Sequence, residues 1–110
     1  MTTPKTVVEW APFELADGID EDTLLNVSDT FQKEFVNTQK GFIQRQLLKG
    51  QDGKWVDLIH WESQEDAEKV LENAEKSEAC RSFFQILKAA DPDAPGAGVL
   101  HFEHVKSYKA

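Results

Sequence analysis

The chain has 110 residues, of which 40% are hydrophobic and 29% charged, so we expect one globular domain over residues 1–110. The formal net charge is −8 and the 12 Lys and Arg residues are scattered, which argues against a nucleic-acid partner. No apolar run approaches the ~20 residues of a membrane helix, and the first residues lack a signal-peptide pattern, so we expect no membrane partner and a cytoplasmic location.

A short strand and a long helix are the first predicted elements. Residues 6–10, TVVEW, are rich in β-branched side chains and end before Pro12, which predicts a strand. After the Asp17-Gly18 turn, an acidic first turn and apolar residues at helical spacing predict an amphipathic helix over about residues 20–38.

The middle of the chain is predicted to form a hairpin. Residues 42–49, FIQRQLLK, and residues 54–61, KWVDLIHW, both have the composition of strands, and GQDG joins them. An Asp-Gly pair between two such runs is a strong hairpin signal.

The remaining residues predict helices and a last strand. Ser63 is a suitable N-cap for a second helix, and a further helical piece is expected over about residues 78–90. Pro and Gly indicate a loop over residues 91–98, and residues 99–108 are predicted to form the fourth strand.

This β-α-β-β-α-(α)-β order predicts an α+β, ferredoxin-like fold. Right-handed crossovers place the four strands in an antiparallel sheet of order 4-1-3-2, with the helices on one face. Apolar residues occur at both parities of the strands, so the other face also needs a cover. We therefore expect the partner of this chain to be a second copy of itself, in a homodimer.

The loop length of the hairpin decides which side chains share a face, and two registers are open. A two-residue turn pairs Arg45 with His60, whereas a three-residue loop with Gly53 in the left-handed conformation puts Arg45 and Asp57 on one face as diagonal neighbours. In the second register the pair forms a polar network that Glu9, on the neighbouring central strand, is placed to join.

A set of residues spread over residues 7–105 carries a resemblance to a known group of proteins. Its elements are Gly41-Phe42 with Arg45, then Asp52-Gly53 with Trp55, Asp57 and Trp61, and finally His101. With them the chain resembles the dimeric α+β-barrel superfamily, and within it the antibiotic biosynthesis monooxygenase-like proteins.

The resemblance implies a dimer of face-to-face sheets, with a pocket between each sheet and its helices. It implies binding of a small apolar or aromatic molecule and, as in some members, oxygenation without a metal or bound cofactor. The alternative is a non-catalytic small-molecule-binding or interaction protein whose aromatic residues serve the core and the dimer interface.

Haem degradation by the route of other superfamily members is not expected. Those members use an Asn on the first strand, and a Trp and a His in the second helical region. Here the first strand offers Glu9 and Trp10, and the regions around Val70 and Cys80 hold neither Trp nor His.

His60 and His101 are the candidate general bases, because a histidine pKa lies near the working pH and both side chains have apolar sequence neighbours. The competing interpretation is a hydrogen-bonded sheet histidine. His101 and His104 differ by three residues and so point to opposite faces, which disfavours a metal site. In the mechanism that the resemblance implies, one histidine deprotonates the substrate, and Arg45 or a Trp N–H stabilises the oxyanion.

Aromatic residues are the candidate lining of the pocket. They are Trp10, Trp61, Phe83 and Phe84, together with Trp55 and Phe102. Core packing or a dimer interface is the alternative role for such side chains. Cys80, the only cysteine, forms no internal disulfide and is expected to pack as a small hydrophobic residue.

Overall fold

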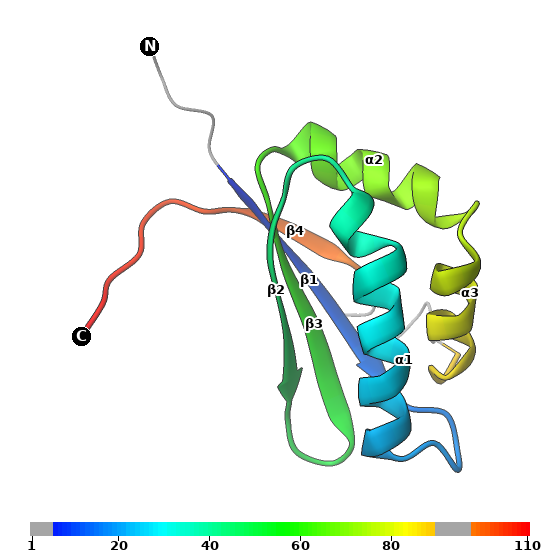
Figure 1. The fold of residues 1–110 in the computed structure, drawn as a ribbon. Helices are drawn as coiled ribbons and strands as arrows, with labels where there is room; N and C mark the ends of the chain where they lie inside the picture. Colours follow the sequence, from blue (N-terminus) through cyan, green and yellow to red (C-terminus); the bar gives the residue numbers. More distant parts are fainter. Residues whose placement is uncertain (1–5, 90–97) are drawn as a thin grey trace.

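The computed structural model describes residues 6–89 and 98–110, which form a sheet covered by helices (Figure 1). In chain order the elements are β1 (Val7–Glu14), α1 (Glu21–Glu34), the 3₁₀ helix η1 (Val36–Thr38), β2 (Phe42–Lys49), β3 (Lys54–Trp61), α2 (Gln64–Ala74), α3 (Glu78–Gln85) and β4 (Leu100–Glu103). None of the described helices is long and apolar enough to cross a membrane.

The sheet has the predicted order. Its strands lie as β2-β3-β1-β4, and all three neighbouring pairs are antiparallel. The helices α1, α2 and α3 lie together on one face of this sheet (Figure 1). The predicted ferredoxin-like α+β fold is therefore confirmed.

The helices begin where side chains can cap them. Asp20 accepts a hydrogen bond from the Thr23 N–H at the start of α1, and Ser63 accepts one from the Asp66 N–H at the start of α2. Each cap satisfies one of the backbone donors that a helix leaves unpaired in its first turn.

β1 is longer than predicted, since it continues through Pro12 to Glu14. Proline lacks an N–H and is usually found where a strand has a free edge. β4 pairs with β1 only as far as Trp10, so Pro12 lies where β3 is the single neighbour. The missing N–H is tolerated there, and the strand does not end.

The last helix and the last strand are shorter than predicted. α3 ends at Gln85, and Leu87 then forms a bridge with Leu15 after β1, which draws the chain out of the helix. β4 ends at Glu103, opposite Val7, which is the first residue of β1. Except for Gly98, the loop predicted over residues 91–98 lies outside the described residues, as does Ala90.

The hairpin takes the register of the three-residue loop. Arg45 lies opposite Ile59, the Gly50 N–H donates to the Lys54 carbonyl at 2.8 Å, and Gly53 has a φ of 75°. Arg45 therefore shares the helix-covered face with Asp57.

The two faces of the sheet differ in cover. The helix-covered face carries most of the core, including Val7, Trp55, Ile59 and Trp61, all less than 10% exposed. The opposite face, here called the open face, carries rows of side chains that the strand pairing aligns. These are His60, Val8 and Phe102; Leu58, Trp10 and Leu100; and Leu48, Val56 and Pro12.

Candidate functional site

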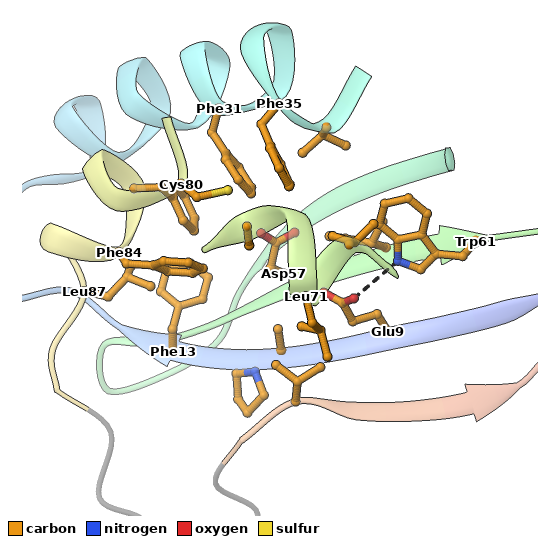
Figure 2. A pocket seen from close by; sticks show the side chains of 18 residues that line it. Glu9, Phe13, Phe31, Phe35, Asp57, Trp61, Leu71, Cys80, Phe84 and Leu87 are labelled. Carbon is orange, nitrogen blue, oxygen red and sulfur yellow. Dashed lines mark hydrogen bonds between the residues drawn. The ribbon is translucent and has the colours of Figure 1, made fainter. Parts of the chain in front are cut away.

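A cavity of about 170 Å³ lies between the helix-covered face of the sheet and the helices (Figure 2). Most of its wall is apolar, and six aromatic side chains contribute to it: Phe13, Phe31, Phe35, Trp61, Phe83 and Phe84. Leu71, Phe84 and Val99 line the cavity and are also 44–53% exposed to solvent. These three residues therefore connect the wall of the cavity with the solvent-exposed surface.

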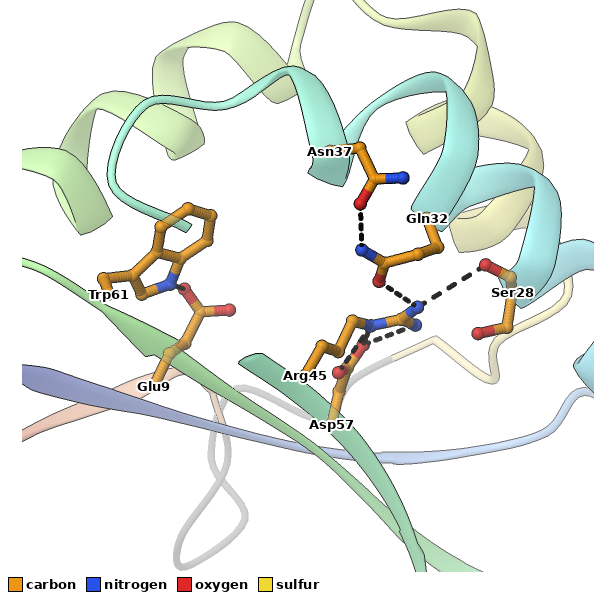
Figure 3. Close-up of polar contacts among 7 residues, drawn as sticks. All are labelled: Glu9, Ser28, Gln32, Asn37, Arg45, Asp57 and Trp61. Atoms are coloured by element: carbon orange, nitrogen blue, oxygen red, sulfur yellow. Dashed lines mark hydrogen bonds and ion pairs between the residues drawn. The ribbon is translucent and has the colours of Figure 1, made fainter. Parts of the chain in front are cut away.

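Glu9 supplies a carboxyl group to this apolar wall. It lies in the middle of β1 and is 7% exposed. Its Oε1 accepts a hydrogen bond of 3.3 Å from Trp61 Nε1 on the neighbouring strand (Figures 2 and 3). Burial raises the pKa of Glu9, the nearby His101 opposes this increase, and Asp57 adds to it. A raised pKa makes the carboxylate of Glu9 a stronger base than that of an exposed glutamate.

His101 lies directly behind this carboxyl group. It faces Glu9 across the β1–β4 pair, and its Nε2 is 3.7 Å from Glu9 Oε1. The Nε2 atom is buried and has no hydrogen-bond partner among the described residues. A small shift of either side chain would convert this contact into a hydrogen bond, so Glu9 and His101 form a carboxyl–imidazole pair.

A buried ion pair occupies the adjacent part of the wall. Arg45 Nε donates to Asp57 Oδ1 at 2.9 Å, Arg45 Nη2 donates to Oδ2 at 3.0 Å, and both side chains are less than 8% exposed (Figure 3). Asp57 lines the cavity, whereas Arg45 lies behind it, with its guanidinium carbon 4.9 Å from the centre of the Phe31 ring. Burial raises the pKa of Asp57, and the Arg45 guanidinium opposes this increase by stabilising the carboxylate.

The helix α1 supplies further partners for Arg45. The Nη1 atom of Arg45 donates to the Ser28 carbonyl at 3.5 Å and to Gln32 Oε1 at 3.4 Å. The Gln32 side chain in turn donates to Asn37 Oδ1. Ser28 and Gln32 were not among the residues predicted from the sequence. Their spacing of four residues on one helix face is the signal that would have found them.

The structure separates the sequence-predicted site residues into two groups. Glu9, Asp57, Trp61, Phe83 and Phe84 line the cavity, while Arg45 and His101 contact the carboxyl groups of the wall.

Trp10 and His60 form the second group. Both lie on the open face and do not line this cavity, because alternate residues of a strand point to opposite faces. Trp10, which was expected to line the pocket, and His60, a candidate base, therefore lie on the face opposite to Glu9 and Trp61.

The other two aromatic residues named as candidate lining, Trp55 and Phe102, do not line the cavity. Trp55 is buried and stacks on Phe13 at 6.2 Å between ring centroids, and Phe102 is on the open face. Phe13 itself was missed as a lining residue, because the predicted first strand stopped before Pro12.

Cys80 packs in the core, as expected. It is fully buried, lines the cavity and follows the α3 cap, where its N–H donates to Ser77 Oγ. Burial raises the pKa of its thiol, which disfavours the nucleophilic thiolate. The described residues include no group of three or more His, Cys, Asp or Glu that could hold a metal ion.

Comparison with known proteins gives similarity at the level of structure. No protein-family model and no curated protein matches the chain. Solved structures do match it, with 46 chains found.

Three of these structures illustrate the range of structural similarity and sequence identity. The cofactor-independent oxygenase SnoaB from Streptomyces nogalater has a TM-score of 0.61 at 14% identity, with 96% of each chain covered. For a putative antibiotic biosynthesis monooxygenase from Bordetella bronchiseptica the TM-score is 0.70 at 14% identity, covering 93% of this chain and 99% of that one. For a heme-degrading protein from Mycobacterium tuberculosis it is 0.55 at 21% identity, covering 94% and 99%. The chain therefore has the fold of the antibiotic biosynthesis monooxygenase-like proteins.

Proposed function

We propose that the protein binds a small apolar or aromatic molecule in the cavity and oxygenates it without a metal or bound cofactor. The observation that carries this proposal is the Glu9–His101 pair at the wall of an otherwise apolar cavity. The fold shared with SnoaB, a cofactor-independent oxygenase, supports the same type of reaction.

The chemistry needs a base in a site with little water. The Glu9–His101 pair removes a proton from an electron-rich substrate, and the electron pair stays on the substrate as a carbanion. Electron transfer from this carbanion to dioxygen and combination of the two radicals give a peroxide, which takes the proton back from the pair. Loss of water then leaves one oxygen atom on the substrate as a carbonyl group. Because Arg45 is paired with Asp57, its guanidinium group does not contact the substrate. Its positive charge stabilises the substrate anion from behind the cavity wall. The apolar surroundings strengthen such electrostatic effects.

Oxygen consumption tests the proposal. Wild-type protein is incubated with dihydroxyaromatic and anthrone-type compounds, and oxygen uptake is followed with an electrode. We expect His101→Ala to lower the rate by about 10²- to 10⁴-fold, the usual contribution of a general base. His104→Ala, which changes a histidine that bonds the exposed Ser107, is the matched control and should keep the wild-type rate.

Two outcomes contradict the proposal. One is a wild-type rate no higher than that of His101→Ala. The other is an equal loss in His60→Ala, because His60 lies on the open face and its loss would place the chemistry on the other side of the sheet.

A specific observation favours a non-catalytic binding protein as the second candidate. Both carboxyl groups of the cavity wall already have partners within the protein, Arg45 for Asp57 and Trp61 for Glu9. Such pairing also suits a structural core. Saturable binding of an aromatic compound with no oxygen uptake would favour this candidate.

We infer that the protein acts as a homodimer through the open face. Four large apolar residues of this face, Trp10, Leu48, Leu100 and Phe102, are 38–52% exposed in the single chain. Contiguous apolar surface of this kind is characteristic of an interface. Light scattering at micromolar concentration should give the mass of two chains, and a monomeric mass would contradict the inference. The cytoplasm stays the predicted location.

A further inference from the structure

The charged side chains that line the cavity are all acidic. Its described lining includes two carboxyl groups, those of Glu9 and Asp57, and no Lys, Arg or His side chain. An entering molecule therefore meets hydrogen-bond acceptors and no cationic side chain on the wall.

The two carboxyl groups differ in how fully they are used. Both oxygens of Asp57 accept hydrogen bonds from Arg45. At Glu9 only Oε1 is engaged, by Trp61 Nε1 and the nearby His101, and Oε2 makes no hydrogen bond with any residue that the structure describes. Of the two carboxyl groups in the described lining, Glu9 therefore has the oxygen that is free to accept, Oε2.

The side-chain N–H donors next to the cavity, those of Trp61 in the described lining and of Arg45 behind it, are already committed. Trp61 gives its only side-chain N–H to Glu9, and the Arg45 guanidinium donates to Asp57 and to α1. A ligand carboxylate entering the cavity would find no partner and would lie beside two acidic groups, which is costly in a desolvated site.

We propose that the cavity selects aromatic molecules that donate an O–H or N–H to Glu9, and that it rejects carboxylates. This inference rests on the proposed function for the existence of a ligand, and it adds the chemical class and the residue that determines it. The cavity of about 170 Å³ is suited to one ring, since a protein cavity of about 150 Å³ binds benzene. Larger substituents would extend toward Leu71 and Phe84, which line the cavity and are about half exposed.

Three compounds of nearly equal size test this selectivity at neutral pH. They are p-cresol, which donates an O–H; p-methylanisole, in which a methyl group replaces that hydrogen; and p-toluate, which is an anion. We expect the wild-type protein to bind p-cresol about 10- to 100-fold more tightly than p-methylanisole, as for a buried acceptor that one ligand satisfies and the other leaves without a donor. p-Toluate should not bind. Titrations followed by NMR give the dissociation constants.

The Glu9→Gln variant tests the residue itself. The glutamine oxygen can keep the hydrogen bond from Trp61, which turns the amide NH₂ of the side chain toward the place of Oε2. The cavity then offers a donor, so we expect p-toluate to bind and the preference for p-cresol over p-methylanisole to fall by at least about tenfold. Glu62→Gln, which changes an exposed glutamate beyond β3, should bind like the wild type.

The outcomes separate this inference from the proposed function. Equal binding of p-cresol and p-methylanisole by the wild type overturns the inference even if Glu9→Gln fails to fold, and so does binding of none of the three. Selective, Glu9-dependent binding without oxygen uptake from any aromatic compound would leave the inference standing and contradict the oxygenase proposal alone.

Discussion

The buried ion pair of Arg45 and Asp57 joins the sheet to α1 and closes one wall of the cavity. Removing one member of such a pair leaves an uncompensated buried charge. We predict that Asp57→Ala lowers the free energy of unfolding by about 3–5 kcal/mol. The double variant Arg45→Met, Asp57→Leu should lose less than Asp57→Ala does, because it leaves no buried charge. Urea unfolding measures all three proteins.

An exposed ion pair in the same protein serves as the control. Lys49 and Glu21 are joined at 2.8 Å, but their side chains are 63% and 48% exposed. Glu21→Ala should cost no more than about 1 kcal/mol. A loss in Asp57→Ala as small as that in Glu21→Ala would show that the Arg45–Asp57 pair does not stabilise the fold.

Glu9 makes the stability of the protein depend on pH. Its pKa is raised above the usual 4.5, chiefly by burial, so the folded state binds a proton more tightly than the unfolded state. The contribution of this proton to the free energy of unfolding is fully present below pH 4.5. It is lost as the pH rises through the pKa that Glu9 has in the folded state. We predict that Glu9→Gln, which cannot ionise, gains stability relative to the wild type as the pH rises above 4.5.

Measuring this difference requires control of the neighbouring titrations. His101 and Asp57 both influence the pKa of Glu9, so urea unfolding of the wild type and Glu9→Gln is compared from pH 4 to pH 8 and repeated in a His101→Asn background. A difference in unfolding free energy that stays constant, or that shrinks with rising pH in both backgrounds, would contradict the prediction.

At the scale of elements, Gly41 controls how η1, β2 and α2 meet. It has a φ of +83°, and a Cβ at this position would overlap the Asp66 side chain at the start of α2. Gly41→Ala therefore introduces both backbone strain and a clash. We predict a loss of about 2–5 kcal/mol in thermal or urea unfolding, the sum of left-handed strain and overpacking.

Gly18 provides a matched control for this substitution. It has the same φ of +83°, but a Cβ there would meet nothing within 4 Å. Gly18→Ala should cost only the strain of the left-handed conformation, about 1–2 kcal/mol. Equal losses in the two variants would mean that α2 moves away from Gly41 without cost.

Local signals explain which elements the sequence predicts well. The bounds of β2 and β3 match the prediction because the Asp52-Gly53 loop and the flanking strands are specified by neighbouring residues. β1 and α3 were predicted less well, because their ends depend on distant partners. β1 continues past Pro12 only because β4 stops short, and α3 ends early because Leu87 pairs with Leu15.

The arrangement of the candidate site likewise depends on residues that are distant in the sequence. Alternation along β1 and β3 indicates that Glu9 and Asp57 point one way and Trp10 and His60 the other. When both faces of the sheet carry apolar residues, this alternation does not indicate which face the helices cover. The pairing of Glu9 with His101 depends on the β1–β4 register, which no local sequence signal specifies.

At the scale of the whole molecule, the sheet has one face covered by helices and one that the single chain leaves partly exposed (Figure 1). Aromatic side chains bury a large apolar area when such a face pairs with a second copy. Phe102 is 52% exposed and lies beside Val8 on this face, and His60 lies on the other side of Val8. A charge introduced there would have to be buried in the proposed interface, at high cost.

We therefore predict that Phe102→Glu shifts the protein from dimer to monomer at micromolar concentration, as measured by light scattering. Leu25→Glu is the matched control, since Leu25 is 43% exposed but lies on α1, away from the open face. It should keep the mass of two chains. Because Phe102 does not line the cavity, a folded Phe102→Glu monomer should still bind p-cresol, which would separate assembly from ligand recognition. A Phe102→Glu protein that keeps the dimeric mass, with unchanged dissociation on dilution, would rule out the open face as the interface.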